Sequence, residues 1–213
     1  MAAPSVGSVF LLFLTFGSTV SSCSLIMHAP PAITEPISLI AVMPVERAEP
    51  SSATPPLDGP PLAPDAERVV TAEIYGVLSS SSRWRVVPDL TVSQALSHIP
   101  PGGNLAARAQ ALGKDVGAEA VLTGAVFRYR ERIGSEFGAR QPAAVGFTLQ
   151  LISVASGKPL WSGTFDQAQQ ALSTNLFNWW QFWQGGPRWF SAPEFTRLGA
   201  ERLLDSLAEQ LGW

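Results

Sequence analysis

The stretch Ala144–Val154, AVGFTLQLISV, decides the fold because its side chains alternate in character from one residue to the next. Apolar residues at every second position are typical of a strand with one buried face. Two more strands are predicted, at Ala120–Arg132 and Pro159–Asp166, so that Ala118–Phe165 forms a three-strand block. In the quoted strand the apolar set is Val145, Phe147, Leu149 and Leu151, and the opposite set is Gly146, Thr148 and Gln150.

A short turn, Ala155-Ser156-Gly157-Lys158, joins the second of these strands to the third, and Gly157 stands where a positive φ is expected. The third strand carries Trp161 and Phe165, whose size suits packing across neighbouring strands. Helices must cover a sheet with so many apolar residues. The sequence therefore predicts an α/β domain.

Composition sets limits on size and partners. The chain has 213 residues, 46% hydrophobic and 15% charged, which is enough for one good core. The formal net charge of -3 argues against nucleic acid as a partner, since phosphate binding needs a basic surface. The single cysteine, Cys23, excludes an internal disulfide.

The first residues contain a targeting pattern. Val6–Val20 is an apolar run, and it is shorter than the roughly 20 residues that a helix needs to cross a bilayer. It ends in Val20-Ser21-Ser22-Cys23, which resembles the bacterial lipobox. The resemblance implies that a signal peptide at 1–22 is cleaved and that the Cys23 thiol is acylated, for example with palmitate. This covalent lipid is the only cofactor expected.

Lipid attachment by several chains gives lasting membrane binding. No Lys or Arg precedes the apolar run, which departs from the usual start of a signal peptide and would follow from a wrongly assigned start codon. The alternative is a short buried or spanning helix with an incidental cysteine. Ser24 is not the Asp that favours inner-membrane retention in the resembled family, so we expect the outer membrane, facing the periplasm, with 23–36 as a tether.

After the tether, strands and helices alternate. Ile37–Val45 is a nearly continuous apolar strand, and Glu46–Pro64 contains six prolines, which predicts an extended loop. The order places the early strands and the three-strand block in one sheet. The next predicted elements are a helix capped by Asp65 to Leu78, a strand at Trp84–Val87, a helix from the capping box at Thr91 to Ser97, and a helix capped by Asn104 to Val116 and ended by Gly117.

Four stretches carry a resemblance to a known envelope domain. They are Leu39–Val45, Trp84–Asp89, Leu112–Gly124 and Leu149–Trp161. Together they resemble the amino-terminal domain of TolB and related lipoproteins, among them the curli secretion protein CsgG and penicillin-binding-protein activators. The resemblance implies a Rossmann-like mixed sheet packed by helices over 37–166, used for protein contacts and without catalytic residues to carry over.

The segment 167–213 combines an aromatic-rich stretch with a C-terminal helix. The capping box and Pro in Ser191-Ala192-Pro193-Glu194 predict the start of that helix, which we expect to pack on the sheet. The aromatic stretch is either a lid on the sheet, a membrane-interface surface or a protein interface. Its candidate contact residues are Trp179, Trp180, Phe182, Trp183 and Trp189.

Groups for catalysis are few. His28 and His98 lack metal-ligating partners at useful spacing, so no metal site is predicted, and no Gly-x-Ser-x-Gly nucleophile motif is present. Arg128, Arg130 and Arg132 alternate onto one strand face, opposite Phe127 and Tyr129. Three interpretations are open: they contact lipid phosphates or an acidic partner, they form a solvated outer face, or they protect a sheet edge from pairing by their charge.

These observations predict a non-catalytic, membrane-anchored periplasmic lipoprotein that serves as an accessory or scaffold for an envelope assembly or transport complex. Its partners are the membrane and envelope proteins, and an oligomer is possible. The alternatives are a subunit of a curli-type secretion pore and an envelope hydrolase. A pore strand needs about 9–11 residues, and the insertion Ile133–Pro142 is short for two of them.

Overall fold

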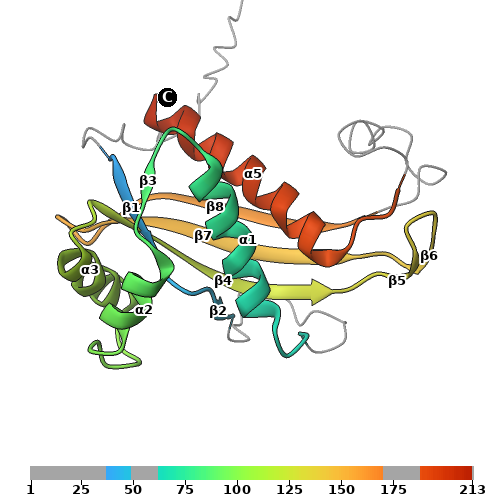
Figure 1. The fold of residues 1–213 in the computed structure, drawn as a ribbon, viewed down its shortest axis with the longest axis horizontal. Coiled ribbons are helices and arrows are strands. Elements are labelled where there is room, and N and C mark those ends of the chain that lie inside the picture. The colour runs from blue at the N-terminus through green and yellow to red at the C-terminus, as the bar shows by residue number, and fades with distance from the viewer. Residues whose placement is uncertain (1–36, 49–61, 170–187, 213) are drawn as a thin grey trace, which may run out of the picture. The chain divides into compact units, whose positions relative to one another are not determined.

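The computed structural model describes residues 37–48, 62–169 and 188–212. Within these ranges the chain forms a six-stranded mixed sheet, four helices and a separate two-stranded hairpin (Figure 1). The strands are β1 Leu39–Val42, β2 Glu46–Arg47, β3 Arg85–Val86, β4 Ala120–Arg130, β5 Ile133–Ser135, β6 Gly138–Gln141, β7 Ala144–Ser153 and β8 Pro159–Ala168. The helices are α1 Ala66–Ser80, α2 Asp89–Leu96, α3 Leu105–Val116 and α5 Ala192–Leu211.

The sheet has the order β3-β1-β4-β7-β8, and β2 pairs with β4 beyond the end of β1. β1 runs parallel to β3 and β4, whereas β7 is antiparallel to β4 and β8. The predicted α/β mixed sheet, with the early strands beside the three-strand block and a helix at the C-terminus, is confirmed. Of the described helices, none has the length and apolar character needed to span a bilayer.

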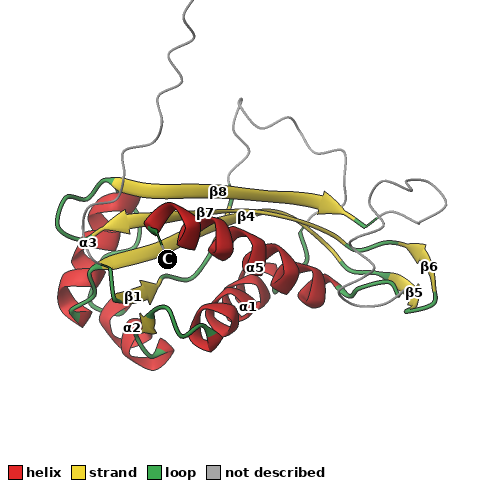
Figure 2. Ribbon diagram, turned by 90° about the horizontal axis from the view of Figure 1, so that it is seen from above, coloured by secondary structure: helices red, strands yellow, loops and turns green. Residues whose placement is uncertain are grey.

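One face of the sheet packs against α1 and α5, which lie side by side (Figure 2), and we call it the α1/α5 face. It receives the predicted apolar set of β7, with Phe147 fully buried. The rings of Phe147 and Phe165 have centroids 5.6 Å apart, and those of Phe165 and Phe195 are 5.5 Å apart. Burying aromatic side chains in such tilted and edge-on contacts makes this face the main core.

The opposite face packs against α2 and α3, and we call it the α2/α3 face. Residues that alternate with the main core along each strand form its smaller cluster, including Ala41, Val121 and Ile152 against Leu112 of α3. Beyond α3, no described helix covers this face. A groove of about 470 Å³ lies there, lined among others by Thr123, Thr148, Gln150, Ser162 and Thr164.

The predicted caps are correct for two of the helices. The Asn104 side chain accepts from the Ala106 N–H at 2.8 Å, and Gly117 ends α3 with φ 69°. Ser191 and Glu194 form the predicted capping box of α5. Gly157 has φ 69°, as expected for its turn. Asp65 precedes α1, but its side chain makes no capping hydrogen bond.

Several boundaries were predicted wrongly: β1 is Leu39–Val42 rather than Ile37–Val45, and β8 runs to Ala168 rather than Asp166. Glu46–Arg47 is a strand rather than loop, because β1 covers only the start of the long strand β4 and leaves Ala125 and Val126 free to pair. Helix α2 begins at Asp89, because Pro88 at the N-cap has φ -55° and an acidic residue follows it, so the Thr91 capping box is not used. Strand β4 ends at Arg130 rather than Arg132.

Candidate interaction site

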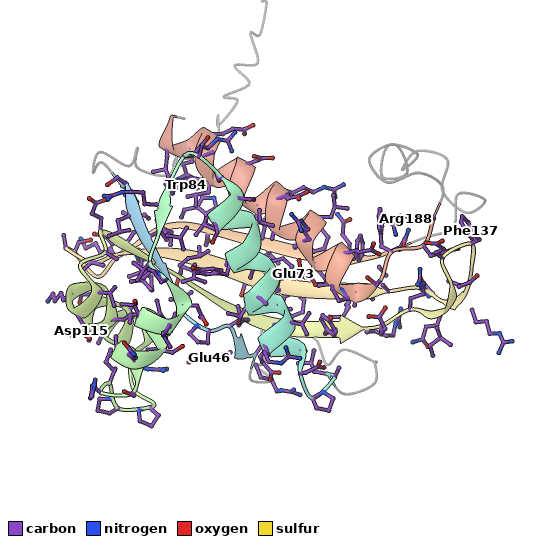
Figure 3. All side chains as sticks on the ribbon, viewed as in Figure 1. Glu46, Glu73, Trp84, Asp115, Phe137 and Arg188 are labelled. Carbon is purple, nitrogen blue, oxygen red and sulfur yellow. The ribbon has the colours of Figure 1, made fainter. Side chains whose placement is uncertain are left out.

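Large hydrophobic side chains are exposed at three of the described positions, Leu90 (70%), Ile133 (54%) and Phe137 (78%). Single exposed apolar residues are common on protein surfaces. Ile133 and Phe137, however, belong to one small hairpin, β5–β6, at the end of the sheet away from β1 (Figure 1; Phe137 is labelled in Figure 3). We call the hairpin and the residues that hold it, Arg132, Glu136, Arg188 and Trp189, the hairpin site.

Hydrogen bonds fix the hairpin to the residues that precede α5. The Trp189 N–H donates to the Glu136 carbonyl at 2.7 Å, and the Arg132 guanidinium donates to the Trp189 carbonyl. Arg188, labelled in Figure 3, lies 3.9 Å from the Glu136 carboxylate. An isolated two-stranded hairpin is only marginally stable, so these contacts are what hold Ile133 and Phe137 in place.

Gln169 connects this segment to the main sheet. Its side chain is 3% exposed, and its amide donates to the Arg188 carbonyl at 3.0 Å and accepts from the Phe190 N–H at 2.8 Å. Its own N–H donates to the Ala143 carbonyl at 3.0 Å. A buried amide satisfied in this way joins the end of β8 to the start of the α5 segment.

The start of α5 contributes a further set of charges. The Glu131 carboxylate accepts from the Ala192 N–H at 3.1 Å, where the positive end of the helix dipole favours an anion. Arg188 lies 2.8 Å from Glu194. Burial by itself raises the pKa of Glu194, but hydrogen bonds from Ser191 and Arg188 outweigh it and hold that pKa below its ordinary value.

Arg128, Arg130 and Arg132, predicted to share one face of a strand, have different surroundings from those expected. Strand β4 lies inside the sheet, so they guard no sheet edge. A bulge between Val126 and Arg128 places Phe127 on the same face as Arg128, where its ring lies against Gly146, instead of beside Tyr129. Arg128 pairs with Asp166 at 2.7 Å. The three arginines are therefore half-buried, and two of them already contact other residues: Arg128 pairs with Asp166, and Arg132 donates to the Trp189 carbonyl.

A second concavity, of about 630 Å³, lies between α1 and α2 at the carboxyl ends of β1 and β3. Such crevices are common ligand sites in α/β sheets. Of its three charged residues, Glu67 pairs with Arg47 at 2.6 Å and Arg68 with Asp65 at 3.2 Å, while Asp89 lies in the first turn of α2. The other lining residues include Val45, Thr71, Ala72 and Tyr75, which offer an apolar recess rather than a set of reacting groups.

The shifted pKa values in the described residues have structural causes. Hydrogen bonding to Arg47 lowers the pKa of Glu67, and backbone N–H groups of Ser38 and Leu39 lower that of Glu119. Burial raises the pKa of the Tyr129 hydroxyl. Within the described ranges, no group of three His, Cys, Asp or Glu residues is placed to hold a metal ion.

The predicted site residues fall into two groups. Trp189 is described, half-buried and part of the hairpin site. Cys23 with the cleavage motif Val20–Ser22, and the contact candidates Trp179, Trp180, Phe182 and Trp183, lie outside the described residues. Sequence reasoning missed Ile133, Phe137 and Gln169. The two glycines that flank Ser135-Glu136-Phe137 were the available signal for a turn there.

No protein-family model and no curated protein matches the chain. Among solved structures, the chain is similar to the LpoB C-terminal domain from Salmonella enterica, with 21% identity, a TM-score of 0.42, and coverage of 65% of this chain and 88% of that one.

Two other solved structures are similar at the same level. Lipoprotein GNA1162 from Neisseria meningitidis has 19% identity and a TM-score of 0.45, and the match covers 69% of this chain and 91% of that one. The PelC dodecamer from Paraburkholderia phytofirmans has 18% identity and a TM-score of 0.43, and the match covers 84% of this chain and 92% of that one. Likenesses at this level assign neither a family nor a function to the chain.

Proposed function

We propose that the protein is a lipid-anchored lipoprotein of the bacterial envelope, attached to the outer membrane and facing the periplasm. It acts without catalysis, as an accessory or scaffold for an envelope assembly or transport complex. The observation that carries this proposal is the sequence Val20-Ser21-Ser22-Cys23 after an apolar run, followed by a 23–36 tether that leads into the α/β domain.

The hairpin site supports the contact role. Exposed apolar and aromatic side chains on a fixed framework are what a binding surface needs, because a rigid surface loses little conformational entropy on binding. Figure 1 shows the hairpin at the other end of the sheet from β1, which is the first strand after residues 23–36 in the sequence. Strand β4 has 11 residues, and at about 3.3 Å per residue it separates the two ends by roughly 36 Å.

The same geometry gives the alternatives less support. Strands β5 and β6 have 3 and 4 residues, well short of the about 9–11 that a spanning pore strand needs. For hydrolysis, a raised carboxylate pKa beside a nucleophile would be the expected feature. The described carboxylates with shifted pKa values, Glu67, Glu119 and Glu194, are all shifted downward by structural partners.

Two separate experiments test the two parts of the proposal. For the anchor, cells expressing the full chain are fed an alkyne-labelled palmitate, and the labelled protein is compared with Cys23→Ala. We expect label only on the parent chain, in the outer-membrane fraction. Label on neither chain would exclude lipidation at Cys23.

For the contact role, a photo-crosslinking amino acid replaces Phe137 in intact cells, with replacement of Leu90 as a matched control because Leu90 is similarly exposed but lies on α2. We expect a discrete crosslinked envelope protein at Phe137 only. Ile133→Ser, in a chain that keeps the photo-crosslinking amino acid at position 137, should lose most of that product while unfolding at the parent temperature. Equal crosslinking from both positions would count against the hairpin site.

A further inference from the structure

The two edges of the main sheet differ in length. At one edge, β3 has two residues, whereas at the other edge β8 has ten. A long edge strand presents a row of unpaired backbone groups that can pair with another strand. Edge strands in soluble proteins are therefore usually short, or carry proline, lysine or a bulge that blocks pairing.

The register shows which backbone groups of β8 point outward. Ala144 pairs with Ala168, and the Gln169 N–H donates to the Ala143 carbonyl. In an antiparallel ladder, alternate residues bond to the same neighbour, so the odd-numbered residues from Trp161 bond to β7. The N–H and C=O groups that point away from β7 belong to Ser162, Thr164, Asp166 and Ala168. No described residue hydrogen-bonds with them.

The usual protections are weak in this part of β8. Its proline, Pro159, is the first residue of the strand, and a bulge at Leu151/Ile152 disturbs the register only near that end. No lysine lies within the strand. Its one charged residue, Asp166, is held by Arg128 at 2.7 Å. Trp161–Ala168 is thus a regular edge on whose outer side no strand among the described residues is paired.

We propose that this edge pairs with β8 of a second copy of the chain, antiparallel and about a two-fold axis at Thr164. An added antiparallel strand must continue both faces of the sheet, the α1/α5 face with the buried Trp161 and Phe165 and the other face with its polar residues. In this register β8 of the second copy places Gly163 opposite Phe165 and Gln167 opposite Trp161 on the first face, and its serine, threonine and aspartate on the second face.

In this arrangement Thr164 lies opposite Thr164 of the second copy, a favourable cross-strand pair. Ser162 lies opposite Asp166 of the second copy, where its hydroxyl can donate to the carboxylate. The two sheets join into one, and the groove of the α2/α3 face continues from one copy into the other. The inference rests on β8 alone and does not depend on the lipid anchor.

Disulfide trapping of the full chain, purified in detergent, tests the pairing. At a two-fold axis the Cα atoms of Thr164 and its counterpart are about 5.5 Å apart, within the range that a disulfide spans. Thr164→Cys should therefore give a covalent dimer on mild oxidation. Ala168→Cys is the matched control on the same face and edge, because its two copies lie roughly 27 Å apart in this register. The parent chain, oxidised in the same way, shows how much covalent dimer forms through Cys23 alone.

A second measurement does not depend on cysteine chemistry. Thr164→Pro removes an N–H that points away from β7, so the monomer should keep its fold by circular dichroism. Light scattering should show dimerisation weakened by about tenfold or more, because two hydrogen bonds across the axis are lost. Thr164→Val keeps the N–H and should still dimerise.

Three outcomes overturn the proposal. The first is a parent chain that is monomeric at all concentrations tested, as when another segment of the same chain or a different protein covers the edge. The second is equal trapping at Thr164→Cys and Ala168→Cys. The third is a folded Thr164→Pro variant that dimerises as well as Thr164→Val.

Discussion

The two faces of the main sheet are built from the same strands but are covered to different extents. Two helices of 15 and 20 residues pack on the α1/α5 face, whereas the helices on the α2/α3 face have 8 and 12 residues. Large aromatic residues fill the first face, and Thr148, Ser162 and Thr164 occupy the open part of the second. The difference indicates that stability comes mainly from one face and that the other remains available for contacts.

Truncating one phenylalanine on each face gives the largest expected effect. Phe147 is fully buried on the α1/α5 face, and Phe147→Ala should lower the free energy of unfolding by about 3–5 kcal/mol. Phe127 is half-buried on the other face, and Phe127→Ala should cost less than about half of that. Urea denaturation measures both. Equal losses would contradict the difference between the faces.

A glycine at each helix–sheet contact tests whether the faces are equally tight where they are covered. A Cβ at Gly199 of α5 would lie 2.7 Å from the Phe165 ring, and one at Gly113 of α3 would lie 2.1 Å from Val154. Alanine at either position should destabilise the protein by about 1–3 kcal/mol, because the helix must move away from the sheet.

Gly76 of α1 is the control for these two glycines, since a Cβ there meets nothing within 4 Å. Gly76→Ala should be stabilising by up to about 1 kcal/mol through helix propensity alone. Thermal unfolding of the three variants separates the two effects. A stabilising Gly113→Ala would show that α3 packs more loosely than described.

Removing the Gln169 amide tests how the hairpin site depends on the main sheet. Gln169→Ala leaves the Phe190 N–H and the Arg188 carbonyl without their partner, at a cost of about 1–3 kcal/mol. We expect faster hydrogen exchange at Phe190 with little change in β7. Gln94→Ala, at an exposed position of α2, is the control. Unchanged exchange at Phe190 would mean that Gln169 does not hold the segment.

The smallest expected effect is electrostatic. Hydrogen bonds from the backbone N–H groups of Ser38 and Leu39 lower the folded-state pKa of Glu119 from its ordinary 4.5. A lowered pKa adds stability above that ordinary value, and the gain is lost as pH falls through the folded-state pKa. Glu119→Gln should cost less than about 1 kcal/mol at pH 7, since the carboxylate is exposed.

Unfolding curves of the parent chain and Glu119→Gln, measured between pH 7 and pH 3, should converge toward the acid end. A difference that grows as pH falls would contradict the assignment.

The sequence predicted the fold well where side-chain periodicity is strong. The alternation in β7 identified the buried face, and the caps of α3 and α5 were correct because cap chemistry is local. β2 was missed because two residues are too few for a period, and its pairing depends on the free part of β4. The face of the sheet on which Phe127 lies was predicted wrongly, because a one-residue bulge between Val126 and Arg128 reverses the alternation of side chains after it.

The candidate site was less predictable. The aromatic composition drew attention to Trp189, and the structure places that residue against the hairpin. Ile133 and Phe137 are unremarkable in sequence, and their exposure follows from a hairpin that extends past the end of the sheet. The role of Gln169 depends on the carbonyl of Arg188 and the N–H of Phe190, about 20 positions further along the chain. No local sequence pattern reveals these contacts.

The junction at Gln169 joins two positions that lie 19 residues apart in the sequence. The Gln169 side chain donates to the Arg188 carbonyl, so the end of β8 is fixed directly to the residues that precede α5. Substitutions or length changes between them therefore need not displace β8 or α5. A direct contact of this kind lets the framework stay constant while the sequence between its two ends changes.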